Sequence, residues 1–297
     1  MASARDIRRR IKGVKGTGKI TRAMEMISAV KMRKAVASVQ AIRPYAETVI
    51  AVLRQLALAG EDHPLLETRA VKRALYVVVS SNRGLCGAFN TQIIKRLRQT
   101  LEEDAALEAV FITLGKKAES AVRRIGRGDI IASFNEVLPF PSALQMRPIS
   151  KILIEEFESK RIDRAVVVYT DFKSMLSQEV KVRALLPVIE KDVHKALHEM
   201  DRKAAPTKML SAEYTIEPSP KKVLWRMIPR LLEMELYHVV LESNASQESA
   251  RMMAMRNATD AAKDMVADLT LAYNQLRQQK ITQEIAELSA GMAAVQK

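Results

Sequence analysis

The apolar positions near the N-terminus repeat with the alternating three- and four-residue spacing of a coiled coil. From Met32 onward, the apolar positions on this spacing are Met32, Ala35, Val39, Ile42, Ala46, Val49, Leu53 and Leu56. With one skip in register, the stripe extends toward the N-terminus through Ile20, Ala23, Ile27 and Val30. We therefore expect residues 1–60 to form a long helix, which Pro44 bends without necessarily ending it.

A second heptad pattern runs through residues 223–297, and no Gly or Pro interrupts the chain between Pro229 and Gly291. Its positions are Met234, His238, Leu241, Ala245, Glu248, Met252, Met255, Thr259, Ala262, Val266, Leu269, Tyr273 and Leu276. A helix of this length cannot bury its apolar stripe in a compact domain, so it must pair with another helix or with other chains. The two terminal helices are natural partners. They run in opposite directions if the segment between them sits at one end.

Between these helices, at residues 70–190, short apolar runs alternate with amphipathic stretches. The runs typical of buried strands are Ala74–Ser81, Ala109–Gly115, Asp129–Phe134 and Arg164–Thr170, with helices expected at about 88–104, 115–125 and 148–161. This alternation favours a parallel sheet with right-handed crossovers. Gln178–Pro187 alternates polar and apolar residues, which predicts an edge strand added by a hairpin. The predicted fold class is α/β, with residues 191–222 connecting the inserted domain to the last helix.

Positive charge is concentrated at the N-terminus. The net charge is +14, and residues 1–34 hold eleven Lys and Arg against Asp6 and Glu25. Such a balance indicates an acidic partner: nucleic acid, an anionic membrane surface or an acidic protein. No aromatic residues interleave with these cations, which favours a solvated basic face or an acidic protein over nucleic acid. The same cluster could pass for a mitochondrial transit peptide, but it leads into a periodic helix without a cleavage signal.

The stretch "VVVSSNRGLCGAFN", residues 77–90, occupies the position of a first strand-to-helix turn, where many α/β proteins bind nucleotides. It matches neither the GxxxxGK[ST] nor the GxGxxG pattern, so its glycines could simply allow close packing of the next helix. His194 and His198 are four residues apart and could share a helix face, but no third metal ligand is nearby in the sequence. Cys86, the one cysteine, fits a small buried residue better than a nucleophile. We predict no catalytic residue, cofactor or metal.

Three separated motifs stand out: residues 11–35, residues 80–90 ("SSNRGLCGAFN") and residues 248–295. Together they resemble the γ-subunit family of the F-type ATP synthases, and the resemblance covers essentially the whole chain. It implies a long antiparallel two-helix coiled coil with an inserted Rossmann-like domain. It also implies a central rotor shaft that turns inside a ring of catalytic subunits and itself performs no chemistry. No segment resembles the cysteine-bearing insertion of the chloroplast members.

The resemblance also assigns contact residues. A basic face that meets acidic loops of the β subunits would contain Lys19, Arg22, Lys31, Arg33 and Lys34, with Met24 facing the same loops. Contacts higher on the shaft would come from Arg277, Gln278, Thr282 and Glu284. The foot toward the ε subunit and the membrane ring would include Tyr214 and Glu217.

The implied partners are three α and three β subunits, the ε subunit and the membrane ring of c subunits, with no nucleic acid. The implied location is peripheral, on the cytoplasmic face of a bacterial inner membrane, or alternatively on the matrix face of the mitochondrial inner membrane. Two other hypotheses remain: a nucleotide-dependent enzyme that uses the turn at Gly84 and Gly87, and a basic coiled coil that binds nucleic acid. The coupling ion, H⁺ or Na⁺, is a property of other subunits.

Overall fold

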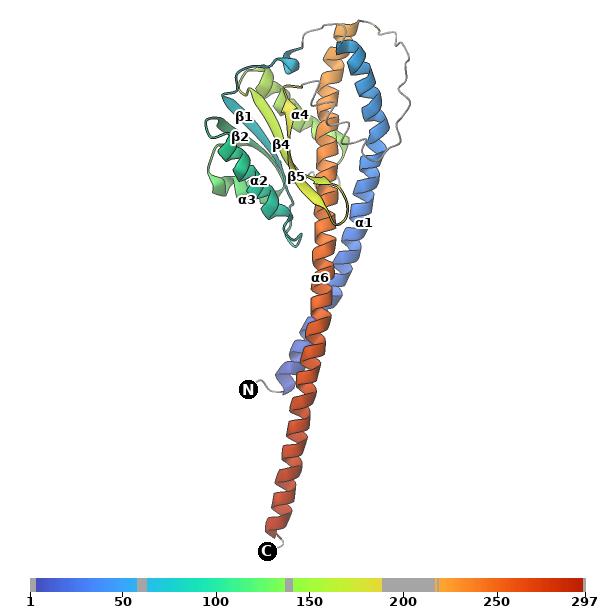
Figure 1. The fold of residues 1–297 in the computed structure, drawn as a ribbon, viewed down its shortest axis with the longest axis vertical. Coiled ribbons are helices and arrows are strands. Elements are labelled where there is room, and N and C mark those ends of the chain that lie inside the picture. Colours follow the sequence, from blue (N-terminus) through green and yellow to red (C-terminus); the bar gives the residue numbers. More distant parts are fainter. Residues whose placement is uncertain (1–3, 58–62, 137–140, 189–216, 218, 296–297) are drawn as a thin grey trace. The chain divides into compact units, whose positions relative to one another are not determined.

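The computed structural model describes residues 4–57, 63–136, 141–188, 217 and 219–295. These residues form the elements labelled in Figure 1, and they divide into two compact units. Unit 1 combines residues 1–29 with residues 251–297, and unit 2 comprises residues 30–250. The long helices α1 (Ala4–Ala57) and α6 (Pro220–Val295) each contribute residues to both units. Because α1 continues to Ala57, Pro44 does not end it, as predicted.

Unit 2 is built on a five-stranded sheet with the order β3-β2-β1-β4-β5. The strands are β1 (Arg73–Val79), β2 (Glu108–Leu114), β3 (Asp129–Phe134), β4 (Arg164–Phe172) and β5 (Gln178–Leu186). The first four are parallel, and β5 pairs antiparallel with β4. The predicted strands, the parallel sheet and the antiparallel edge strand are therefore confirmed.

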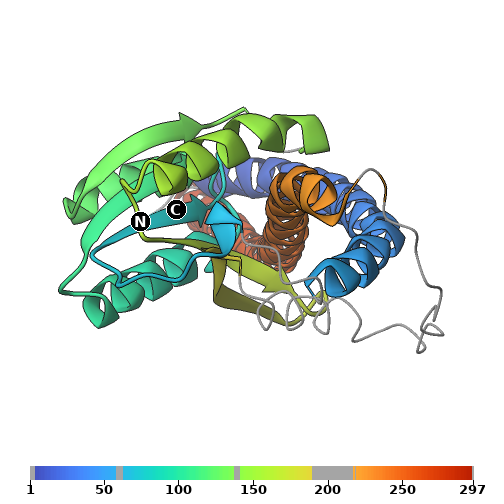
Figure 2. The same ribbon diagram turned by 90° about the horizontal axis from the view of Figure 1, so that it is seen from above.

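Helices cover both faces of this sheet. Figure 2 shows α2 (Phe89–Glu103) and α4 (Ala143–Glu158) on opposite faces. The short helix α3 (Lys116–Ile125) packs on the face of α2, whereas the first part of α6 packs on the face of α4. The central strand β1 is buried on both sides: Leu75 and Val77 face α4, while Tyr76 faces α2. This explains why its sequence is a continuous apolar run.

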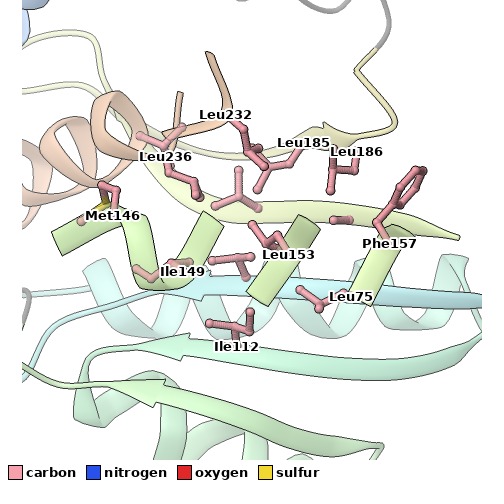
Figure 3. Close-up of a cluster of buried hydrophobic side chains, with 14 of the residues drawn as sticks. Leu75, Ile112, Met146, Ile149, Leu153, Phe157, Leu185, Leu186, Leu232 and Leu236 are labelled. Atoms are coloured by element: carbon pink, nitrogen blue, oxygen red, sulfur yellow. The ribbon is translucent and has the colours of Figure 1, made fainter. Parts of the chain in front are cut away.

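The face covered by α4 and α6 holds the larger hydrophobic cluster. In Figure 3, Ile149 and Leu153 of α4 lie over Leu75 and Ile112, and Leu232 of α6 joins the same cluster. Each such side chain contributes about 1.5–3 kcal/mol when fully buried. This apolar contact fixes the first part of α6 to the sheet.

Helix α4 begins at Ala143, five residues before the predicted start at 148. The reason is a capping box, in which Ser142 N–H donates to Oε1 of Gln145 at 2.9 Å and the Ser142 side chain accepts from the backbone of the same glutamine. Pro148 therefore lies inside the helix and not at its first turn.

Unit 1 is an antiparallel pair of helices, residues 4–29 of α1 and residues 251–295 of α6. The hydroxyl oxygens of Thr21 and Thr259 lie 2.7 Å apart. Gly18 precedes Thr21 by three residues, and Ala262 follows Thr259 by three residues. A Cβ built at Gly18 would lie 3.4 Å from the Cβ of Ala262. Because a step toward the N-terminus in α1 corresponds to a step toward the C-terminus in α6, the two helices are antiparallel.

The predicted seam of α1 is wrong between residues 20 and 30. Ile20, Ile27 and Val30 are 63%, 56% and 57% exposed, although the skipped register assigned them to the seam. The seam instead continues the heptad of Met32 and Ala35 without a skip, and its most buried positions before Met32 are Ser28, Thr21 and Ile7. Small and polar residues line this part of the seam, and the hydroxyl groups of Thr21 and Thr259 are hydrogen-bonded to each other.

The predicted seam of α6 is confirmed in unit 1. Met255 and Thr259 are buried at 5% exposure each. From there the less exposed positions recur at heptad spacing and are separated by exposed residues. These positions are Ala262, Val266, Leu269, Tyr273 and Leu276.

Candidate partner interface

The loop after β1 caps a helix within the same domain. Three amide groups at the start of α3 are hydrogen-bonded: Lys116 N donates to Asn82 Oδ1 (3.0 Å), Lys117 N to the Ser81 carbonyl (3.1 Å), and Ala118 N to Ser80 Oγ (2.6 Å). Amides at a helix N-terminus are the groups that bind phosphate in many nucleotide sites. Here the "SSN" of the loop already occupies them.

The rest of the loop closes on itself. Asn90 Nδ2 donates to Ser81 Oγ at 2.8 Å and to the sulfur of Cys86 at 3.1 Å. Cys86 is buried, as predicted for a small packed residue. The glycine that requires a close approach is Gly115, at the start of α3: its φ is +97°, and a Cβ there would lie 2.6 Å from the Ser80 carbonyl oxygen. The loop therefore serves the folding of the domain, and its geometry does not support a nucleotide site.

Helix α6 lies against the carboxyl end of β4, beside the point where the strand order reverses between β1 and β4. Ser246 Oγ donates to the Thr170 carbonyl at 3.2 Å, and Ser249 Oγ donates to the Met175 carbonyl at 2.8 Å. Ala250 packs against the cluster that contains Cys86. In open α/β sheets this reversal point is where ligands usually bind, and here a helix of the same chain packs beside it.

Other candidate sites of chemistry are equally unsupported. Among the residues that the structure describes, no three His, Cys, Asp or Glu side chains are grouped to hold a metal ion. His194 and His198 lie outside the described residues. None of the helices described is both long enough and apolar enough to cross a membrane.

The outward face of α1 in unit 1 combines exposed apolar side chains with cations. Ile20, Met26 and Ile27 are 63%, 61% and 56% exposed. Lys19 and Arg22 are exposed beside them. Large apolar side chains that gather on a surface mark a site of interaction with another protein or a membrane. This face therefore has the composition of a partner interface.

The end of α6 has no α1 residue beside it. Thr21 of α1 faces Thr259 of α6, and α1 begins at Ala4, so the paired part of α6 ends near Leu276. Residues 277–292 are all exposed, and in Figure 1 this part of α6 extends past the start of α1. Four of its apolar residues recur at near-heptad spacing with exposures of 46–69%: Ile281, Ile285, Leu288 and Met292. Such a stripe would pack against another chain.

Comparison with known proteins decides the family. A family model described as ATP synthase matches residues 3–295. The chain is 38% identical to the ATP synthase gamma chain of Heliobacterium modesticaldum over 302 residues, which cover 99% of this chain and 100% of the relative. It is 40% identical to that of Dehalococcoides mccartyi over 300 residues, with 99% and 100% coverage. The chain belongs to the ATP synthase gamma chain family.

Solved structures from ATP synthases share the fold. A chain of the Euglena gracilis mitochondrial ATP synthase matches with a TM-score of 0.65 and 20% identity, covering 98% of this chain and 94% of that one. A chain from the central stalk and c-ring structure of the Tetrahymena thermophila mitochondrial enzyme matches with a TM-score of 0.60 and 23% identity, covering 80% and 99%. At these identities the likeness is one of fold.

The contact residues expected from the gamma chain family divide between the two units. In unit 1, Lys19 and Arg22 are exposed on α1, and Met24 is half-buried. At the end of α6, the exposed residues are Arg277, Gln278, Thr282 and Glu284. In unit 2, Arg33 and Lys34 are exposed and Lys31 is half-buried. Glu217 is exposed, whereas Tyr214 lies outside the described residues.

Three acidic side chains of unit 1 are paired with cations of the same surface. Arg22 forms an ion pair with Glu25 at 2.9 Å, and Lys280 forms one with Glu284 at 3.5 Å. A hydrogen bond from Lys263, at 2.8 Å, holds the pKa of Asp260 below its ordinary value, and Arg22 of α1 adds a smaller effect in the same direction. These three pairs partly neutralise the positive charge of this surface.

Sequence reasoning missed the outward residues Ile20, Met26 and Ile27 as contact candidates, because it used apolarity as the marker of the seam. A signal was nevertheless present. The heptad of Met32, continued backward without a skip, reaches Ser28, Thr21 and Val14. That register places Ile20 and Ile27 outside the seam, where the structure has them.

Proposed function

We propose that the chain is the central rotating shaft of an F-type ATP synthase. It couples the ion-driven rotation of a membrane ring to conformational changes at catalytic sites on the surrounding β subunits. The observation that carries the proposal is the antiparallel helix pair of unit 1, whose outward faces and unpaired α6 end expose apolar residues and cations together. Such surfaces suit a helix pair that is enclosed by other subunits.

The composition of the outward face also suits contacts that must change during rotation. Ion pairs between exposed groups contribute about 0–1 kcal/mol each. A face that intersperses Lys19 and Arg22 with Ile20 and Ile27 can therefore form contacts without one deep energy minimum. We propose that Lys19, Arg22, Lys31, Arg33 and Lys34 meet acidic loops of the β subunits, with Met24 facing the same loops.

The remaining contacts follow the same proposal. We assign contacts with the upper part of the ring to Arg277, Gln278, Thr282 and Glu284, which lie on the exposed end of α6. Glu217 and Tyr214 belong to the proposed foot toward the ε subunit and the c ring. The proposed location is peripheral, on the cytoplasmic face of a bacterial inner membrane. Full-length similarity to the gamma chains described above supports this arrangement.

We further propose that the chain performs no catalysis and that the nucleotides bind to the neighbouring subunits. The filled amide groups of α3 support this, because Ser80, Ser81 and Asn82 occupy the groups that a phosphate would need.

Co-expression with α and β subunits tests the proposal. We expect one copy of the chain to purify with three copies of each, and we expect ATP hydrolysis by this complex to drive rotation of the chain under a single-molecule microscope. Isothermal calorimetry on the isolated chain should give no heat of ATP binding. Stoichiometric binding of ATP to the isolated chain, or failure to assemble with α and β, would contradict the proposal.

A further inference from the structure

The first turns of α6 present an exposed face of cations around a single tryptophan. Lys221, Lys222, Trp225 and Arg226 are all exposed. Trp225 is the only tryptophan of the chain, and 45% of its surface is accessible. The opposite side of the same turns carries Leu224 and Ile228, which are buried in the core of unit 2. This part of α6 is therefore amphipathic, with a polar side that the described residues do not cover.

Trp225 is held in place by a buried histidine. The ring centroids of His63 and Trp225 lie 4.6 Å apart. Nδ1 of His63 accepts a hydrogen bond from Leu65 N at 3.1 Å, and burial lowers the pKa of the imidazole, so the ring is neutral. The tryptophan is thus ordered and yet exposed. Tryptophan with one wet and one apolar side is the residue enriched where proteins meet the boundary of a membrane.

The cations of this face do not serve the stability of the helix. Cations in the first turn oppose the helix dipole, and the first turn of α6 contains no acidic residue. Within the described part of the chain, Lys221, Lys222 and Arg226 make no ion pair. Arg230, further along, is paired with Glu233 at 2.6 Å. Glu217, just before the helix, is the nearest acidic residue in the described sequence.

We propose that Lys221, Lys222, Trp225 and Arg226 form a lipid-docking face that contacts anionic phospholipid headgroups. The cations would lie among the phosphates, and the indole would lie at the boundary between headgroups and acyl chains. A convex helix face with a central tryptophan suits a continuous surface better than an acidic peptide, which would need separate sites for its side chains. This inference depends on the proposed function in one respect: the proposed function places the chain beside a membrane.

The single tryptophan makes the lipid-docking face directly observable. The full-length chain is mixed with vesicles of phosphatidylcholine alone or of phosphatidylcholine with phosphatidylglycerol. With the anionic vesicles, we expect the emission of Trp225 to shift to shorter wavelength and to be quenched by lipids brominated on their acyl chains. The variant K221Q/K222Q/R226Q should bind these vesicles on the order of 100-fold more weakly, because each cation near an anionic surface contributes on the order of fivefold.

A matched control is needed because the basic residues of α1 also attract anionic vesicles. The variant R8Q/R9Q/K12Q removes the same number of exposed cations from unit 1. It should bind fewer vesicles, but its bound fraction should keep the full shift and quenching of Trp225. If the native chain binds anionic vesicles without a change in tryptophan emission, the proposal is wrong. A shift caused by an acidic peptide such as polyglutamate, but not by vesicles, would likewise overturn it in favour of a protein partner.

A second measurement separates this inference from the proposed function. K221Q/K222Q/R226Q should assemble with α and β subunits and support ATP hydrolysis in solution like the native chain, because no membrane is present. If the native chain failed to assemble, the proposed function would fail while the fluorescence result would still stand. If the native chain assembles normally but Trp225 does not respond to lipid, the lipid-docking proposal is wrong and the proposed function still stands.

Discussion

The sheet of unit 2 and the helix pair of unit 1 use apolar side chains in opposite ways. In the sheet, Leu75 and Val77 are completely buried between layers of the same chain. In the helix pair, Ile20 and Ile27 are more than half exposed, whereas the buried seam contains Thr21 and Ser28. The sheet therefore has a hydrophobic core of its own, whereas the helix pair leaves much of its apolar surface exposed.

This difference predicts where stability and function separate. Truncation inside the sheet should lower the free energy of unfolding, because a cavity remains where the side chain was. Truncation on the outward face of the helix pair should leave the isolated chain almost unchanged and should weaken assembly. A mutation can therefore be assigned to folding or to partner contact by its position alone.

The largest expected effect comes from Leu153→Ala in α4. Leu153 is completely buried in the larger hydrophobic cluster (Figure 3), so its truncation should cost about 2–5 kcal/mol of unfolding free energy. Ile27→Ala is the matched change on α1, and it should alter that free energy by less than about 0.5 kcal/mol. Chemical denaturation measures both variants, and co-purification with α and β subunits should be weakened by Ile27→Ala only. Equal destabilisation by the two changes would abolish the distinction between the units.

A smaller effect, dependent on pH, is expected at Asp163 in the sheet domain. Its carboxylate accepts hydrogen bonds from the backbone N–H groups of Lys72 (2.9 Å) and Arg73 (3.0 Å), and these bonds, together with the nearby Arg69, hold its pKa below the ordinary value. A lowered pKa in the folded state stabilises the protein above the pKa of the unfolded state. That stability is lost as the pH falls through the folded pKa.

Asp163→Asn should therefore cost about 1–3 kcal/mol near neutral pH. The difference from the native chain should shrink as the pH drops toward the folded pKa, and denaturation curves at several pH values measure it. Asp260→Asn, at an exposed carboxylate of the helix pair, is the control and should change stability little at any pH. A pH-independent cost at Asp163 would show that the loss comes from packing and not from charge.

The fold of the sheet domain could be predicted from sequence because its parallel strands are short apolar runs and its antiparallel edge strand alternates polar and apolar residues. Asp129–Phe134 coincides with β3, and Arg164–Thr170 falls within β4. The strand order could not be predicted, since it depends on pairings between segments far apart in the chain. The role of the "SSN" residues was hidden for the same reason. Their partners at Lys116 and Ala118 follow them by more than thirty residues and reach them only through the parallel pairing of β1 and β2.

The pairing of the two terminal helices could be predicted from the sequence, but the register of α1 between residues 20 and 30 could not. Apolarity identifies a seam when the seam is apolar, as at Met32 and Ala35. It fails on the exposed outward face, where Ile20 and Ile27 are as apolar as core residues. A small residue such as Gly18, where an added Cβ would lie 3.4 Å from the Cβ of Ala262, allows a close approach of the two helices that the pattern of hydrophobicity does not reveal.

The buried threonine pair sharpens the corrected register. Thr21→Val removes the hydrogen bond between the two hydroxyls and leaves Thr259 Oγ1 with only its bond to the Met255 carbonyl (2.8 Å), which should cost about 1 kcal/mol. The double variant T21V/T259V removes both hydroxyls and should recover most of that loss, so it should cost less than the sum of the two single changes. Thermal denaturation followed by circular dichroism measures all four proteins. Additive effects of the two changes would place the threonines outside a common seam.

The smallest effect should be a gain in stability at Gly13 of α1. A Cβ at this position meets nothing within 4 Å, and glycine inside a helix costs about 0.5–1 kcal/mol relative to alanine. Gly13→Ala should therefore stabilise the helix pair by that amount, as a higher midpoint in chemical denaturation. Gly128→Ala in unit 2 is the opposite case, because its φ is +107° and its Cβ would lie 2.0 Å from the Ala109 carbonyl oxygen. If Gly13→Ala stabilises the chain but slows ATP-driven rotation in the assembled complex, the glycine is retained for contact with the ring; unchanged rotation would instead leave it without a functional reason.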